Sequence, residues 1–267
     1  MKLDRRITPH SGRVAHVSLQ GRVQAAAFVA GEACCIVQPL VDLCDAPNGM
    51  RDRQLLLGDT FLVIERRDDW VFGQSDRGGY CGWVPVAAVG VAQAPTHWVS
   101  ALASHVYAEP RVQARECMAL TTGARVRVTG VQGAWAETPL GFIPAMHVRS
   151  IGDWATDPVA VVEAFLGVPY LWGGNSAAGL DCSGLVQAAW LACGRDCPGD
   201  SDQQQALGRD FRGRARRGDL IFWQGHVAIV TGPDRIIHAN GHTMNVAYEH
   251  VGAAIARIGT DVIARRR

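Results

Sequence analysis

Apolar residues recur at helical spacing in one stretch of the chain, between Asp181 and Gly194. They stand at positions 185, 186, 189, 190 and 193, which is the pattern of a single buried helix face. Asp181 has the side chain of a good N-cap, and Gly194 follows the last apolar position as a C-terminal stop. The pattern therefore predicts a mostly buried helix whose first residue is Cys182.

Short apolar runs of β-type composition lie upstream of this helix and are repeated once. The first strand candidates cover residues 58–65, 70–73 and 80–85. Residues 123–129 repeat the glycine-led strand, with Gly123 standing 65 residues after Gly58. Trp70 and Trp135 each lie twelve residues after the glycine of their own copy. The tetrapeptide GFIP at 141–144 echoes GWVP at 82–85. Two copies predict two small β-barrels, because a solenoid needs more and shorter units. Unrelated hairpins that share a tryptophan are the alternative.

The C-terminal region combines helices with later strands. Asp157 and Pro158 begin a helix that is expected to run to about residue 166, since proline is tolerated in a first turn. Strand candidates at 219–223, 226–230 and 235–239 follow the Cys182 helix and a polar loop. Helices followed by antiparallel strands predict the α+β class. The predicted organisation is a lead-in segment (1–33), a first barrel (34–92), a second barrel (93–150) and a C-terminal domain (151–267).

Composition and charge exclude several partners. The 267 residues carry 26 basic and 25 acidic side chains, a formal charge of +1, so no nucleic acid or anionic membrane is predicted. Arg265, Arg266 and Arg267 are interpreted as a solvated tail. The eight cysteines form no CxxC pair or zinc-type spacing, and no apolar run has the length of a signal peptide or membrane span. A cytoplasmic protein with free thiols is predicted.

The candidate chemistry is that of a reactive cysteine with two histidines. A thiol at a helix N-terminus ionises more readily, and the thiolate is the nucleophile. His226 and His238 flank the turn at 231–234 almost symmetrically, so we expect them to be near cross-strand neighbours on one face of a hairpin. One imidazole would accept the thiol proton while the other orients it. A buried structural cysteine, ordinary core histidines, or a zinc site made of Cys182, His226 and His238 are the alternatives.

Several motifs together resemble the NlpC-type cysteine peptidases. They are GVPYLWGG at 167–174, DCSGL at 181–185, RGDLIFW at 217–223, HVAI at 226–229 and IHA at 237–239. The resemblance implies a circularly permuted papain-like domain that cleaves peptides of bacterial peptidoglycan without a cofactor or metal. The N-terminal repeats resemble the bacterial SH3 domains of a subgroup that releases dipeptides from free murein peptides in cell-wall recycling.

The resemblance also assigns roles to individual residues. It makes Cys182 the nucleophile, His226 the base and His238 the orienting third member. It further implies six substrate-binding residues: Tyr170 beside the oxyanion hole, Asp181 and Ser183 near the substrate amine, Ser201, and Tyr80 and Asp59 from the first barrel. The alternatives are a core aromatic for Tyr170, a plain N-cap for Asp181, a cap for Ser201 and a solvated strand carboxylate for Asp59.

The expected activity is release of L-Ala-γ-D-Glu by cleavage of the γ-D-glutamyl–diamino acid bond. The expected substrate is a murein tri- or tetrapeptide with a free N-terminus, and the sequence leaves protein partners undetermined. An acyltransferase or amidase of the same fold, or a non-catalytic cell-wall-peptide binding protein, are the alternatives.

Overall fold

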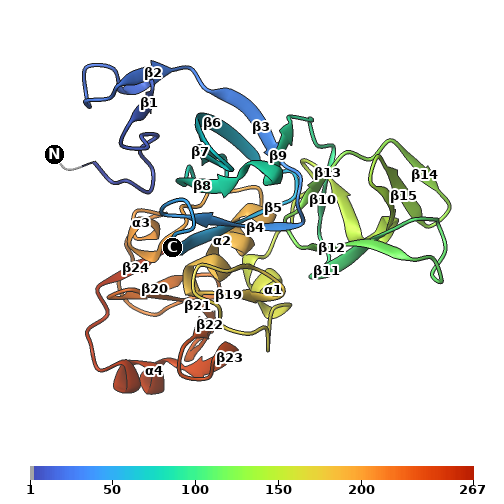
Figure 1. Ribbon diagram of the computed structural model, residues 1–267. Helices are drawn as coiled ribbons and strands as arrows, with labels where there is room; N and C mark the ends of the chain where they lie inside the picture. Colours follow the sequence, from blue (N-terminus) through green and yellow to red (C-terminus); the bar gives the residue numbers. More distant parts are fainter. Residues whose placement is uncertain (1–2) are drawn as a thin grey trace. The chain divides into compact units, whose positions relative to one another are not determined.

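The computed structural model describes residues 3–267 (Figure 1). Met1 and Lys2, which belong to the predicted lead-in, lie outside the described residues. The chain divides into two compact units, Met1–Ile151 and Gly152–Arg267, and each is described by itself.

The lead-in of unit 1 has structure of its own and is tied to the first barrel. It contains β1 (Val14–His16), a 3₁₀ turn η1 (Val17–Leu19) and β2 (Ala27–Val29), which pairs in parallel with β1. Arg13 Nε donates to Glu65 Oε1 over 2.8 Å, and Ser11 Oγ donates to the other oxygen of the same carboxylate. Glu65 thus holds the lead-in against the sheet that follows.

The first barrel is a seven-stranded sheet in the order β5-β4-β8-β7-β6-β3-β9. Its strands are β3 (Glu32–Ile36), β4 (Leu40–Cys44), β5 (Arg51–Leu56), β6 (Thr60–Arg67), β7 (Trp70–Ser75), β8 (Cys81–Pro85) and β9 (Val89–Val91). The core between them is apolar and includes the buried side chains of Ile36, Leu43, Phe61 and Val71. The three strand candidates of the first copy correspond to β6, β7 and β8.

The second barrel consists of a five-stranded and a three-stranded sheet, in the orders β12-β11-β16-β15-β14 and β13-β10-β17. Its strands are β10 (His97–Val99), β11 (Ala103–Tyr107), β12 (Glu116–Thr121), β13 (Arg125–Val126), β14 (Gly130–Gln132), β15 (Trp135–Thr138), β16 (Gly141–Pro144) and β17 (Val148–Ser150). The strand expected at 123–129 is shorter than predicted. The amide of Val128 donates to Oγ1 of Thr96 over 2.9 Å instead of joining a strand.

The two copies share the same local order of a strand, a 3₁₀ turn and a further strand. Pro85 ends β8 and Pro144 ends β16, and each proline is the N-cap of a 3₁₀ turn, η2 (Val86–Ala88) or η3 (Ala145–His147), which leads into the next strand. The GWVP and GFIP motifs therefore mark equivalent strand ends.

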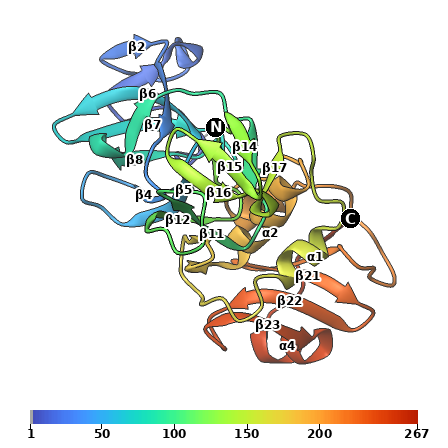
Figure 2. The same cartoon turned by 90° about the vertical axis from the view of Figure 1, so that its right-hand side faces the viewer.

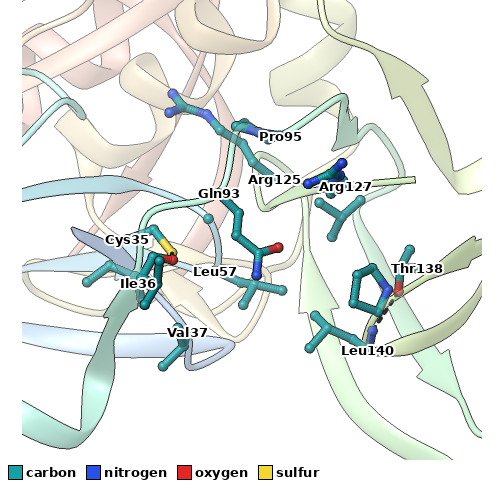
Figure 3. A pocket seen from close by; sticks show the side chains of 14 residues that line it. Cys35, Ile36, Val37, Leu57, Gln93, Pro95, Arg125, Arg127, Thr138 and Leu140 are labelled. Atoms are coloured by element: carbon teal, nitrogen blue, oxygen red, sulfur yellow. Dashed lines mark hydrogen bonds between the residues drawn. The ribbon is translucent and has the colours of Figure 1, made fainter. Parts of the chain in front are cut away.

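The two barrels of unit 1 are joined by shared core residues. Leu56, the last residue of β5, and the next residue, Leu57, pack with Val99, Val106 and Ile143 of the second barrel. A pocket of about 130 Å³ also lies between the barrels and is lined by apolar and basic side chains, among them those of Arg125 and Arg127 (Figure 3). None of the predicted site residues lines this pocket.

Unit 2 combines four helices with a five-stranded antiparallel sheet in the order β23-β22-β21-β20-β24. The helices are α1 (Pro158–Glu163), α2 (Cys182–Ala192), α3 (Ser201–Gln204) and α4 (Val251–Ile258). The strands are β20 (Leu220–Trp223), β21 (His226–Gly232), β22 (Arg235–Asn240), β23 (Asn245–His250) and β24 (Ala264–Arg266), with a small ribbon of β18 (Asn175–Ser176) and β19 (Gly179–Leu180). Helices α1 and α2 pack together and against β21, and α4 lies beside β23 (Figure 2). The predicted α+β class is confirmed.

Two expectations about unit 2 need correction. Helix α1 ends at Glu163 rather than near residue 166, because the next three amides bond three residues back in a tighter turn. The C-terminal arginines are not a solvated tail. β24 pairs with β20, and Arg267 donates to both carboxylate oxygens of the buried Asp219. Among residues 3–267, the structure has no helix with the length and apolar composition that a membrane crossing requires.

Candidate active site

The start of α2 is fixed by one carboxylate. Asp181 is the N-cap, and its Oδ1 accepts hydrogen bonds from the amide of Gly184 (2.7 Å) and the hydroxyl of Ser183 (3.1 Å). Its Oδ2 accepts from the amide of Gly173 over 2.9 Å. Cys182 is the first residue of the helix, as predicted, and its side chain is buried. The N-cap therefore also clamps the glycine-rich turn beside the cysteine.

The glycines at this turn are required by a close backbone approach. A Cβ atom on Gly184 would lie 2.5 Å from the carbonyl oxygen of Gly174 and 2.9 Å from the side-chain oxygen of Asn175. Only glycine lets the first turn of α2 pack this closely against the approach segment. The first turn of α2, which carries Cys182, therefore lies directly against the approach segment.

Tyr170 is placed beside the same helix start by the backbone. It forms a parallel bridge with Leu180, the residue before the N-cap, and its amide donates to the carbonyl of Met244 over 2.9 Å. The side chain is half-buried rather than part of the closed core. This position agrees with the predicted role near the reacting carbonyl, which stays a prediction.

A chain of buried amide side chains supports α2. Asn175 Nδ2 donates to Gln187 Oε1 over 2.9 Å, and Gln187 Nε2 donates to the carbonyl of Cys197 over 3.0 Å. Gln204 Nε2 donates to the carbonyl of Ser183 over 2.9 Å. Sequence reasoning missed these residues, because an amide in a polar stretch gives no signal until its partners are known.

His226 and His238 meet through their rings. Nε2 of His226 and Nδ1 of His238 are 2.9 Å apart, and the ring centroids are 5.0 Å apart. The register pairs Ile229 with Ile237, and continuing it makes the two histidines diagonal rather than directly opposite neighbours. The register changes by one residue at an irregularity between Val230 and Gly232, and this change places both histidines on the same face of the hairpin. The expected contact exists, in a different register.

Burial lowers the pKa of His226 to about 4, helped by His238 and Arg257 and opposed by Glu249 and Asp181. Burial likewise lowers the pKa of His238 to about 4, although Glu249 partly raises it. Both imidazoles are therefore neutral at pH 7, so one ring nitrogen of each is a hydrogen-bond acceptor. Helix α2, which begins at Cys182, packs on β21 and β22, the two strands that carry the histidines.

The remaining predicted residues have different surroundings. Ser183 and Ser201 are buried, and Ser201 is the first residue of α3, whose N-cap is Asp200, so the alternative of Ser201 as a cap is wrong. Tyr80 lies in unit 1, buried in the apolar core of the first barrel.

Asp59, also in unit 1, is completely buried and accepts hydrogen bonds from Arg77 and from the amide of Leu56, so the alternative of a solvated strand carboxylate is wrong. These partners account for Asp59 within the barrel, and its contact with the substrate amine stays a prediction.

Within residues 3–267, no group of three or more His, Cys, Asp or Glu side chains is arranged to hold a metal ion. Among residues 3–267, none of the eight cysteines forms a disulfide bond.

Two family models match this chain. Residues 167–257 match the NlpC/P60 family, and residues 43–89 match the bacterial dipeptidyl-peptidase SH3 domain. The γ-D-glutamyl-L-lysine dipeptidyl-peptidase of Bacillus cereus is 28% identical over 222 residues, which are 70% of this chain and 67% of that protein. Dipeptidyl-peptidase 6 of Lysinibacillus sphaericus is 26% identical over 232 residues, 72% of this chain and 82% of that protein.

The fold has a counterpart among solved structures. The crystal structure of an NlpC/P60 family protein from Bacillus cereus superposes with a TM-score of 0.77 at 21% identity, covering 88% of this chain and 99% of that one. The α+β fold of unit 2, with a cysteine at the start of α2, is that of a papain-like cysteine peptidase. More specifically, residues 167–257 form an NlpC/P60 domain, and a bacterial dipeptidyl-peptidase SH3 domain at residues 43–89 precedes it.

Proposed function

We propose that this cysteine peptidase releases the dipeptide L-Ala-γ-D-Glu from free murein tri- or tetrapeptides by cutting the bond between γ-D-glutamate and the diamino acid. In this proposal Cys182 is the nucleophile, His226 the general base and His238 the residue that orients it. The observation that carries it is the 2.9 Å contact between His226 Nε2 and His238 Nδ1, formed by neutral rings on strands that pack against the cysteine-bearing helix.

The chemistry follows from this arrangement. The thiol proton of Cys182 passes to His226, and the thiolate attacks the γ-carbonyl carbon of the glutamyl residue. The tetrahedral intermediate collapses to a thioester while His226 returns the proton to the leaving amine of the diamino acid. A water molecule, deprotonated by His226, then hydrolyses the thioester and frees the dipeptide. The hydroxyl of Tyr170 is proposed to stabilise the developing negative oxygen.

The proposed substrate is supported by the named activity of the relatives and by the negative charge of Asp181. The Bacillus cereus and Lysinibacillus sphaericus relatives are named as dipeptidyl-peptidases, and the former as acting on γ-D-glutamyl-L-lysine. Asp181 carries a buried carboxylate next to Cys182, which favours a substrate with a cationic N-terminus close to the cleaved bond. Ser183 and Ser201 remain proposed contacts for the rest of the peptide.

Product analysis tests the proposal. The protein is incubated with L-Ala-γ-D-Glu-L-Lys and with the corresponding diaminopimelate peptide, and the products are identified by mass spectrometry, with Cys182→Ala as the blank. Release of the intact dipeptide supports the proposal. Acyl-transfer products, or cleavage only of sugar-linked peptide, favour the acyltransferase or amidase alternative. Binding without turnover favours the non-catalytic alternative.

A cytoplasmic location is also part of the proposal, since free murein peptides are recycled inside the cell. It is supported by the eight cysteines, none of which forms a disulfide bond among residues 3–267. Fractionation of cells that express the protein from its own gene tests this part separately from the chemistry.

A further inference from the structure

Three polar side chains form a diagonal row across three neighbouring strands of unit 2. His226 lies on β21, His238 on β22 and Glu249 on β23. The register pairs Ile236 with Glu249 and His238 with Ala247, so Glu249 is the diagonal neighbour of His238 on the same face. Long side chains reach each other at this spacing. Oε2 of Glu249 lies 3.1 Å from Nε2 of His238.

The carboxylate of Glu249 is held in place from the following helix. Arg257, on α4, donates from Nε to Oε1 over 2.9 Å and from Nη2 to Oε2 over 2.7 Å. These hydrogen bonds hold the pKa of Glu249 below its usual range. Glu249 is therefore ionised at neutral pH, and an ionised carboxylate only accepts hydrogen bonds.

The carboxylate of Glu249 determines whether Nε2 of His238 carries a proton. The ring is almost completely buried, and Nε2 has no well-aligned hydrogen-bond partner among residues 3–267. Glu249 is at hydrogen-bond distance but off the N–H axis, so the interaction is mainly electrostatic. A negative charge at 3.1 Å still strongly favours the tautomer with a proton on Nε2, since the other tautomer would set a lone pair against it.

We propose that Glu249, anchored by Arg257, is a positioning residue that sets the direction of the hydrogen bond between the two histidines. A proton on Nε2 of His238 makes its Nδ1 an acceptor. Nε2 of His226 must then be the donor across the 2.9 Å contact. The proton of neutral His226 therefore resides on Nε2, and its Nδ1 carries the lone pair that accepts a proton. This inference rests on the proposed role of His226 as the base for Cys182.

The same carboxylate stabilises the charged intermediate state. When Nδ1 of His226 takes the thiol proton, the row gains a positive charge, and Glu249 favours protonation of both rings. The other groups that act on the row are Asp181 before α2, which also favours protonation, and Arg257 of α4, which opposes it. His242, in the loop after β22, acts on Glu249. Loss of Glu249 should therefore raise the pH at which Cys182 becomes reactive.

Alkylation of Cys182 tests this without any peptide substrate. The intact protein reacts with iodoacetamide from pH 5 to 10, and mass spectrometry follows the Cys182 peptide, which separates it from the seven other cysteines. For Glu249→Gln, the rate at pH 7 should fall about tenfold, the lower end of the 10- to 100-fold losses seen when a partner that orients a metal-bound histidine is removed. The midpoint of the pH profile should move to higher pH. Because no peptide is involved, a wrong substrate assignment leaves this test intact.

Two further variants separate charge from packing. Glu163→Gln is the matched control, since Glu163 also pairs with an arginine in unit 2 and contacts neither histidine; its alkylation profile should equal that of the unaltered protein. Glu249→Asp keeps the charge and should lose less reactivity than Glu249→Gln. A larger loss for the aspartate would overturn the proposal in favour of packing.

A double-variant cycle decides whether Glu249 acts through His238. In a His238→Ala background, Glu249→Gln should have almost no further effect on alkylation, because the group it orients is gone. Full additivity of the two substitutions, or an unchanged midpoint in the single Glu249→Gln variant, would overturn the proposal. Thermal unfolding of each variant confirms that the compared proteins are folded.

Discussion

Arg77 and Asp59 form a buried, two-point ion pair inside unit 1. Nε and Nη2 of Arg77 donate to the two carboxylate oxygens over 2.7 and 2.8 Å, and Nη2 also donates to the carbonyl of Gly123 in the second barrel over 3.2 Å. The pair thus connects the first barrel to the second. Its geometry gives Asp59 a structural role.

Removing one partner of this pair should destabilise unit 1. Arg77→Met leaves the carboxylate of Asp59 buried without its counter-charge, and such changes cost about 3–5 kcal/mol. Chemical denaturation followed by tryptophan fluorescence measures the loss, and Asp59→Leu in the same chain should restore part of it. If Asp59→Asn left stability unchanged but raised KM, the substrate contact would be the better account of Asp59.

Cys182 should be indispensable for turnover. Cys182→Ala removes the nucleophile, so kcat should fall at least about 1000-fold, as losses of a catalytic nucleophile do. Peptide binding, measured by calorimetry, should change little. Cys193→Ser, at the other end of the same helix, is the matched control and should keep its activity. A Cys182→Ala protein with full activity would establish a binding function instead.

His238 should affect kcat far more than KM. His238→Ala leaves His226 without its hydrogen-bond partner, and we expect kcat to fall about 100-fold or more, the usual scale of acid–base assistance. Steady-state kinetics separate the two constants. His105→Ala, in unit 1, serves as the control. An effect confined to KM would contradict the orienting role.

Stability should fall as the pH drops below neutral. Both histidines have folded-state pKa values lowered to about 4, whereas an unfolded histidine titrates near its ordinary value of about 6.5. Between pH values of about 4 and 6.5 the unfolded chain binds protons that the folded chain does not. The free energy of unfolding is therefore highest above the unfolded-state pKa and decreases as the pH falls toward the folded-state pKa. Urea denaturation at pH 7.5 and 5.0 should show this, and His238→Gln should reduce the difference. If the difference in unfolding free energy between pH 7.5 and 5.0 were the same in His238→Gln, His238 would not contribute to this pH dependence.

The substrate amine should matter for turnover. Acetylation of the N-terminus removes the cation that the buried Asp181 carboxylate is proposed to attract, so kcat/KM should fall about tenfold or more, as expected for loss of a charge-assisted hydrogen bond. Parallel assays of free and capped tripeptide measure the ratio. Equal turnover of the two peptides would remove the argument for amine recognition while leaving the cysteine chemistry intact.

The local part of the site was predictable from the order of residues. The cap at Asp181, the apolar spacing behind it and the stop at Gly194 depend on neighbours within a few positions, and α2 begins at Cys182 as expected. The histidines on either side of one turn were also predictable as partners. Their exact pairing was not, because an irregularity of one residue changes the register without a distinct sequence signal.

Contacts between residues far apart in the sequence could not be predicted from the local pattern of apolar and polar positions. Glu249 comes next to His238 only through the register of β22 with β23, and Arg257 reaches it only because α4 folds back onto the sheet. The pairing of Arg267 with Asp219, residues that are 48 positions apart, has the same origin.

The sequence by itself determined the α+β class, the duplicated β-rich segment, and a cysteine placed at a helix start with two histidines nearby, because capping and periodicity act over a few residues. The tertiary structure alone decided which ionised groups surround those histidines and which acidic side chains form ion pairs within the protein. These contacts join residues on separate strands and helices. They form only when those elements pack together, so no single segment of the sequence specifies them.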